Sequence, residues 1–102
     1  MGRLVNIRVK DYVDQVYSND DGKIIYNELK KELARSNKIA VSFKEISALN
    51  SSFVNSAFIE LLEDYDFQFI KENLRFVDST KQINNMIKSR FSFEVNHRKA
   101  YN

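Results

Sequence analysis

The side chains most clearly placed for chemistry belong to four consecutive residues, Asn50-Ser51-Ser52-Phe53. They lie between a short apolar segment, residues 39–43, and a helical pattern of apolar residues that begins at Phe53. Small hydroxyl residues in this position are typical of a helix N-cap, because the side-chain oxygen accepts hydrogen bonds from the free amides of the first turn. The same position suits a bound or attached phosphate, since the helix dipole favours negative charge there. The segment therefore predicts a helix cap, and Ser51 or Ser52 is a candidate regulatory phosphorylation site.

Acidic residues are close together in two places, at Asp20 and Asp21 and again at Glu60, Glu63 and Asp64. Paired carboxylates can perform acid–base catalysis when one of them is desolvated. Here they flank the exposed faces of predicted helices or a helix start, so we interpret them as solvated surface. His97 is the only histidine and the chain has no cysteine, which leaves too few soft ligands for zinc and excludes a catalytic thiol. With no glycine-rich phosphate loop either, we predict no enzyme, no metal site and no cofactor.

The C-terminal end interleaves aromatic residues with basic ones, and the basic residues are Lys88, Arg90, Arg98 and Lys99. Basic side chains with stacking rings are typical of proteins that bind single-stranded nucleic acid. The alternative is a terminal amphipathic helix whose Phe91 and Phe93 pack against the sheet. The formal net charge of +2 favours the helix, because so small a charge is no argument for nucleic-acid binding.

The composition is that of one small globular domain. The chain has 102 residues, of which 43% are hydrophobic and 13% aromatic. No apolar run reaches the roughly 18 residues of a membrane span, and the first residues lack the apolar core of a secretory signal. We therefore expect a cytoplasmic protein with no membrane contact. We expect one domain over residues 1–95 and a flexible C-terminal tail over residues 96–102, where the periodic pattern fades.

Hydrophobic periodicity divides the chain into alternating strands and helices. Strands are predicted at residues 5–10, 39–43 and 74–77, and helices after residue 20, from residue 53 to 65, and from about residue 80 to 91. Two capping pairs, Ser18 with Asp21 and Ser79 with Gln82, support two of the helix starts, and Ser36-Asn37 is a helix stop. Residues 66–73 stay ambiguous and suggest a packed turn.

The order β-α-β-α-β-α predicts an α/β domain. We expect a mixed, mostly parallel sheet of about three to four strands with about three to four helices. Charge is unevenly placed along it, because acids dominate residues 53–80 and bases dominate residues 81–102. These two parts are expected to attract each other, within one subunit or between two.

The middle of the chain resembles the STAS-like domain family, a group of unknown function that is distantly similar to sulfate-transporter and anti-sigma-antagonist (STAS) domains. The resemblance rests on Ile39-Ala40-Val41-Ser42-Phe43, then Ile46, then Asn50-Ser51-Ser52-Phe53 and a helix that runs to Leu62. Val9-Lys10-Asp11-Tyr12, the segment 18–22, and Leu74-Arg75-Phe76-Val77 followed by a helix fit as well. The resemblance spans about residues 5–92.

This resemblance implies a role for the serine loop. In anti-sigma antagonists the matching loop reads Asp-Ser-Ser/Thr-Gly, and a partner kinase of the histidine-kinase ATPase fold phosphorylates a serine in it. Ser51 is similar to that serine, with Ser52 beside it. This chain departs from the pattern at Asn50, which replaces the acid, and at Phe53, which replaces the glycine. Ser42 also stands where STAS-like relatives commonly carry an acid.

Three functional hypotheses follow. The resemblance implies a non-enzymatic, protein-binding regulatory switch that is paired with a kinase-like ATPase. The second hypothesis is a small inhibitor from a phage or mobile element that blocks a nuclease or another host complex, as anti-CRISPR proteins do. The third is nucleic-acid binding through the basic C-terminal segment. Thirteen Phe and Tyr residues and an exposed edge strand at residues 5–9 also favour a homodimer.

Overall fold

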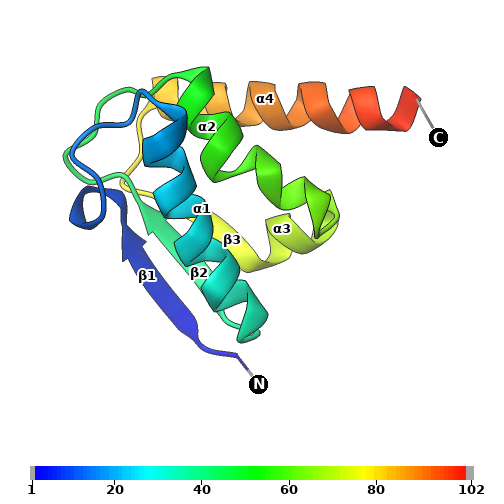
Figure 1. Cartoon of the computed structure of the whole chain (residues 1–102), viewed down its shortest axis with the longest axis horizontal. Helices are drawn as coiled ribbons and strands as arrows, with labels where there is room; N and C mark the ends of the chain where they lie inside the picture. The colour runs from blue at the N-terminus through cyan, green and yellow to red at the C-terminus, as the bar shows by residue number, and fades with distance from the viewer. Residues whose placement is uncertain (1, 101–102) are drawn as a thin grey trace.

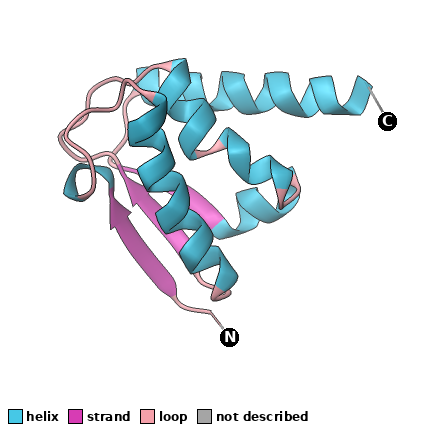
Figure 2. Cartoon of the chain, in the orientation of Figure 1, coloured by secondary structure: helices cyan, strands magenta, loops and turns pink. Residues whose placement is uncertain are grey.

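A computed structural model describes residues 2–100 of the chain, with side chains for residues 2–98. Within that range the strands are β1 (Leu4–Arg8), β2 (Lys38–Ser42) and β3 (Leu74–Val77). The α-helices are α1 (Asn19–Ala34), α2 (Ser51–Ala57), α3 (Phe67–Asn73) and α4 (Lys81–Ala100). Two short 3-10 helices, η1 (Val9–Asp11) and η2 (Ile59–Glu63), complete the elements (Figures 1 and 2).

The sheet has the order β1-β2-β3, and both pairs of strands are parallel. When successive β-α-β connections have the same handedness, their helices lie on the same face of the sheet. Figure 1 shows α1 and α2 on the same side. The face toward these helices carries Ile7, Ile39 and Val41, which are all buried. The opposite face carries Asn6 and Arg75, which are exposed. The predicted α/β fold is confirmed, and the described sheet is wholly parallel.

Helix α1 follows the predicted pattern closely. Ser18 is its N-cap, and the Ser18 hydroxyl oxygen accepts a hydrogen bond from the Asp21 amide at 3.1 Å. Ile25, Leu29 and Leu33, one helical turn apart, form its buried stripe. The helix ends at the predicted stop. Ser36 takes the left-handed conformation there, with φ of 63°. The sequence led us to expect this conformation at Asn37, the next residue.

Helices α1 and α2 approach each other closely at Gly22. A Cβ atom at this position would lie 2.7 Å from the carbonyl oxygen of Phe53 and 2.8 Å from the Cβ of Ser56. The missing side chain of Gly22 therefore lets the backbone of α2 rest directly against α1. The Ser56 hydroxyl adds a hydrogen bond of 2.8 Å to Oδ1 of Asn19, at the start of α1.

A cluster of four phenylalanines joins α2 to the sheet. Phe58 contacts Phe43, Phe53 and Phe76 edge-on, with ring centroids 6.2, 6.2 and 5.1 Å away, and Phe43 stacks on Phe76 at 5.8 Å. Such offset and edge-to-face pairs are the preferred aromatic geometries. Because Phe43, Phe53 and Phe58 are fully buried, the cluster forms the centre of the core.

Some predicted boundaries are wrong. The helix predicted for residues 53–65 ends at Ala57, because Phe58 leaves the helical conformation and η2 follows it. The ambiguous segment is the helix α3, whose N-cap Asp66 accepts a hydrogen bond from the Phe69 amide at 2.8 Å. The first strand ends at Arg8, and α4 continues through residues 96–100 of the predicted tail. The flexibility of that tail and the single-domain boundary stay predictions.

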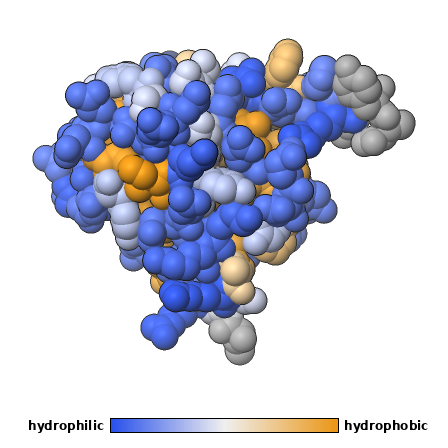
Figure 3. Space-filling model, viewed as in Figure 1, coloured by the Kyte–Doolittle hydropathy of each residue, from blue (hydrophilic) through white to orange (hydrophobic). Residues whose placement is uncertain are grey.

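None of the described helices is both long enough and apolar enough to cross a membrane. Figure 3 shows the face of α1 and α2 as largely hydrophilic, with hydrophobic residues visible only in limited areas.

Candidate functional site

Asn50 is the N-cap of α2. Its Oδ1 accepts a hydrogen bond from the Phe53 amide at 3.0 Å, and its Nδ2 donates to the carbonyl oxygen of Tyr17 at 2.9 Å. The predicted cap is therefore present, but an amide side chain supplies it and the serine hydroxyls do not. Asn and Ser are comparable N-caps, so residue type alone does not decide between neighbours.

The three residues after the cap have different environments. Ser51 occupies the first helical position and is exposed, whereas Ser52 is half-buried. Phe53 is fully buried in the aromatic cluster. The departures from the anti-sigma-antagonist pattern thus have structural roles, since Asn50 caps α2 and Phe53 fills the core. Ser51 is left with an exposed hydroxyl that makes no hydrogen bond within the described part of the chain.

The loop before Ser51 is held by the start of α4. The Gln82 side chain accepts a hydrogen bond from the Leu49 amide at 3.1 Å and donates one to the Leu49 carbonyl at 2.9 Å. The Thr80 hydroxyl donates to the Ser47 carbonyl at 2.8 Å, and its oxygen accepts from the Ile83 amide at 3.3 Å. Thr80 therefore caps α4, where the sequence predicted Ser79. These contacts, together with the bond from Asn50 to Tyr17, fix the position of Ser51.

The carboxyl ends of the strands bring together polar residues that the sequence analysis did not connect. The Ser42 hydroxyl donates to the Asp78 carboxylate at 2.7 Å. Asp78 thus supplies an acid, from the residue that follows β3, beside Ser42 at the end of β2. The Arg8 side chain at the end of β1 pairs with Glu45. Glu45 and Asp78 both have positive φ angles, 67° and 53°, which is uncommon outside glycine.

Acidic residues of the described chain mostly lie in surface contacts. Asp64 pairs with the Lys30 ammonium at 2.9 Å, and Glu63 pairs with the Arg98 guanidinium at 2.9 Å. The hydrogen bond to Asp64 and the nearby Tyr26 raise the pKa of Lys30 above its ordinary value of 10.5. Among the described residues no group of three or more His, Cys, Asp or Glu side chains is arranged to hold a metal ion.

The basic residues of the C-terminal segment do not form one patch. Arg90 donates to Oδ1 of Asn55 at 2.8 Å, pairs with Glu94 at 3.8 Å and stacks over the Phe93 ring at 5.1 Å. Arg98 pairs with Glu63, so one ion pair joins the basic end to the acidic middle within the subunit. Lys88 lines a separate groove against α3 and β3. The Lys99 side chain lies outside the described residues.

Comparison with known families gives a match over much of the chain. The model of the STAS-like domain of unknown function (DUF4325) matches residues 21–84, which is more than half of the chain. The matched segment includes most of α1, all of β2, the Asn50–Phe53 loop and β3. Searches of curated proteins and of solved structures give no significant match. The family match and the parallel α/β fold agree with the resemblance carried by the strand-to-helix loop, and the chain belongs to the STAS-like family.

Proposed function

We propose that the protein is a non-enzymatic regulatory module that binds another protein through the surface around Ser51. Its partner is an ATPase of the histidine-kinase type, and phosphorylation of Ser51 breaks the complex. The environment of Ser51 carries this proposal. The Ser51 hydroxyl is exposed, and it does not cap α2 because Asn50 does so.

The hydrogen bonds that hold the surrounding loops support the same proposal. Asn50 binds the connector before α1, and Gln82 binds the loop before α2. A partner would therefore meet a preformed surface and would lose little entropy in ordering it. A phosphate on Ser51 would add about −1.5 to −2 charge units at neutral pH, which is enough to disrupt an interface formed with an uncharged serine.

The experiment is co-purification of the tagged full-length chain from its native cells. We expect a kinase-like ATPase to be recovered with the unmodified chain and with the variant Ser51→Ala, and to be lost with Ser51→Asp. Ser89→Asp is the matched control, because Ser89 is an exposed serine in the middle of α4. Phosphate mapping of the purified chain by mass spectrometry is expected to find the modification on Ser51.

The same experiment separates the competing hypotheses. Recovery of a nuclease or another host complex, unaffected by Ser51→Asp, would contradict the switch and support the inhibitor hypothesis. Recovery of nucleic acid that is lost with a Lys88→Glu and Arg98→Glu double variant would support nucleic-acid binding.

A further inference from the structure

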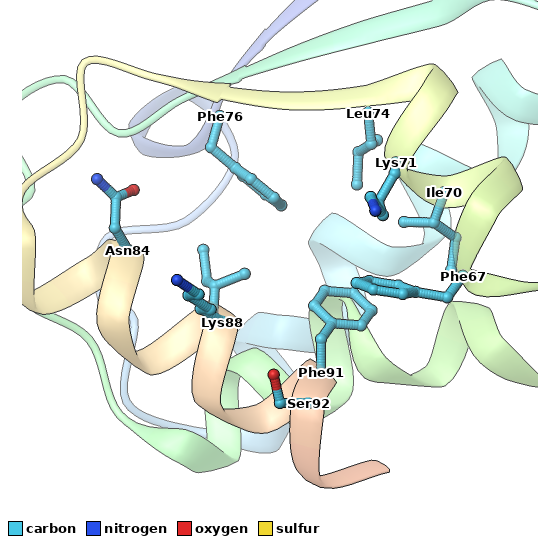
Figure 4. Close-up of a pocket in the computed structure, with 10 residues that line it drawn as sticks. Phe67, Ile70, Lys71, Leu74, Phe76, Asn84, Lys88, Phe91 and Ser92 are labelled. Carbon is cyan, nitrogen blue, oxygen red and sulfur yellow. The ribbon is translucent and has the colours of Figure 1, made fainter. Parts of the chain in front are cut away.

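An apolar groove lies between α3, β3 and α4, in a part of the surface formed by residues other than those around Ser51. It has a volume of about 520 Å³. Its lining is mainly apolar, and these side chains are Phe67, Ile70, Leu74, Phe76, Ile87 and Phe91. Figure 4 shows Leu74 and Phe76 descending from β3, with α4 opposite them and α3 at one end. The stacked rings of Phe67 and Phe91, with centroids 5.2 Å apart, line the α3 end of the groove.

The groove runs beside a free strand edge. Among the strands that the structure describes, β3 pairs with β2 alone, so no described strand lies beside its other edge. The Val77 carbonyl accepts a hydrogen bond from the Phe43 amide at 3.1 Å and therefore faces toward β2. Because the backbone groups of successive strand residues point to opposite edges, the N–H and C=O of Phe76 face outward. An extended segment could pair with these groups while its alternate side chains enter the groove.

Two lysines give the groove a positive charge. Lys71 on α3 and Lys88 on α4 both line it, and both are exposed. The Lys71 ammonium lies 5.3 Å from the centroid of the Phe67 ring. Neither lysine makes an ion pair with any residue that the structure describes. A carboxylate on a bound segment would therefore gain a partner at either side chain.

The charges of the strands disfavour a second copy of this chain as the occupant. Strand β1 reads LVNIR and strand β3 reads LRFV, so neither contains an acid. Pairing either strand with the β3 edge of another copy would bring no strand carboxylate to Lys71 or Lys88. A second copy would therefore leave both lysines without a matching charge from the added strand.

We infer that this groove binds an extended acidic segment of a partner protein, by strand addition to β3. The segment pairs with the backbone of Phe76. The side chains on its groove-facing side include apolar groups, which insert between β3 and α4, and carboxylates, which contact Lys71 and Lys88. Strand addition of this kind takes affinity from main-chain hydrogen bonds and specificity from side-chain pockets. This interface is independent of Ser51, so the protein would hold two contacts with its partners.

The test uses the full-length chain and a small panel of short synthetic peptides that carry Val, Ile, Phe and Glu at alternate positions, on one face of the extended strand, with Ser or Thr between them. Nuclear magnetic resonance titration is expected to show binding at the groove, and hydrogen exchange is expected to show protection of the Phe76 amide. The double variant Lys71→Glu with Lys88→Glu should bind these peptides about tenfold more weakly and should bind the matching Lys-containing peptides more tightly. Lys23→Glu is the control, because Lys23 is an exposed lysine on α1.

Several results would overturn the inference. One is the absence of binding by every Glu-containing peptide. Another is equal binding by peptides whose backbone nitrogens are methylated, since methylation removes the donors needed for strand pairing. A third is concentration-dependent dimerisation that protects the Phe76 amide without peptide. Displacement of the peptides by decanoate with no protection of Phe76 would instead indicate a site for small amphipathic acids.

Discussion

At the scale of single residues, two adjacent side chains at the start of α2 have different roles: one caps the helix, and the other offers an exposed hydroxyl. Asn50 satisfies the Phe53 amide and also holds the Tyr17 carbonyl, so it carries the structural task. Ser51 is exposed in the next position and carries none of these bonds. A modification of the Ser51 hydroxyl therefore changes the surface charge without removing the cap.

We expect Asn50→Ala to lower the free energy of unfolding by about 1 kcal/mol, because the α2 cap is lost. Ser51→Ala should change it by less than about 0.5 kcal/mol. Urea denaturation of the two variants measures both effects. An equal loss in both variants would mean that the serine, and not Asn50, stabilises the helix start.

The contact between Lys30 and Asp64 predicts a pH dependence of stability. The pKa of Lys30 is raised in the folded state above 10.5, first by its hydrogen bond to Asp64 and then by Tyr26. A raised lysine pKa stabilises the folded state fully below the unfolded value and loses this effect as the pH rises through the folded value. The stability difference between the native chain and Lys30→Met should therefore be constant at neutral pH and shrink above pH 10.5.

The check is urea denaturation of both chains across this alkaline range at low salt, since salt screens exposed pairs. A difference that does not change with pH would contradict the assigned contact.

At the scale of elements, the contact of α1 with α2 depends on a residue that lacks a side chain. Gly22 lies where a Cβ atom would be 2.7 Å from the Phe53 carbonyl. Helix α2 has seven residues and bears both the exposed Ser51 and the buried Phe53. The packing against Gly22 therefore sets the position of the candidate site relative to the longer helix.

Gly22→Ala tests this packing, because the sign of the change in the free energy of unfolding depends on it. In an ordinary helix the substitution stabilises by about 0.5–1 kcal/mol, because alanine is the better helix former. Here we expect a loss of about 1–3 kcal/mol, since the new methyl group overlaps the α2 backbone. Asn27→Ala, at an exposed position of α1, is the control and should be neutral or stabilising. A stabilised Gly22→Ala variant would show that the helices are not in such close contact.

At the scale of the whole molecule, the phenylalanine cluster connects the end of β2, helix α2 and strand β3. Phe58 contacts the other three members of the cluster and lies between α2 and η2. The same β3 residue, Phe76, reaches both this cluster and the groove. The core and the proposed strand-addition site therefore share a side chain, and binding there is expected to stabilise the fold.

We expect Phe58→Ala to lower the free energy of unfolding by about 3–5 kcal/mol, the usual loss for a buried phenylalanine. Phe93→Ala, at a side chain that is 57% exposed, should cost far less. Thermal and urea denaturation give both values. Similar losses in the two variants would contradict the central place of Phe58 in the core.

Much of the element order could be predicted from local patterns, and the errors have a common cause. Ile25, Leu29 and Leu33 repeat with the period of a helix, so α1 is visible in the sequence. The end of α2 at Ala57 is not visible in the sequence, because Leu61, Leu62 and Tyr65 continue the same apolar period beyond it. Phe58, where the helix breaks, packs against Phe43 and Phe76, and local periodicity does not record such distant contacts.

Part of the candidate site could likewise be predicted from the sequence, and part could not. The position of the loop and the exposure of Ser51 agree with the local sequence, which is typical of a helix start. The choice of Asn50 as cap could not be predicted, because Asn and Ser are nearly equal caps. The pairing of Ser42 with Asp78 joins residues 36 positions apart, so no local pattern contains it.

The most direct test of the regulatory proposal is the affinity of the purified partner ATPase for the chain, measured by calorimetry. We predict that Ser51→Asp binds at least about tenfold more weakly than the unmodified chain, because the added charge enters the interface. Ser89→Asp should bind as the unmodified chain does. Equal affinities for Ser51→Asp and the unmodified chain would contradict the assignment of Ser51 as the switch.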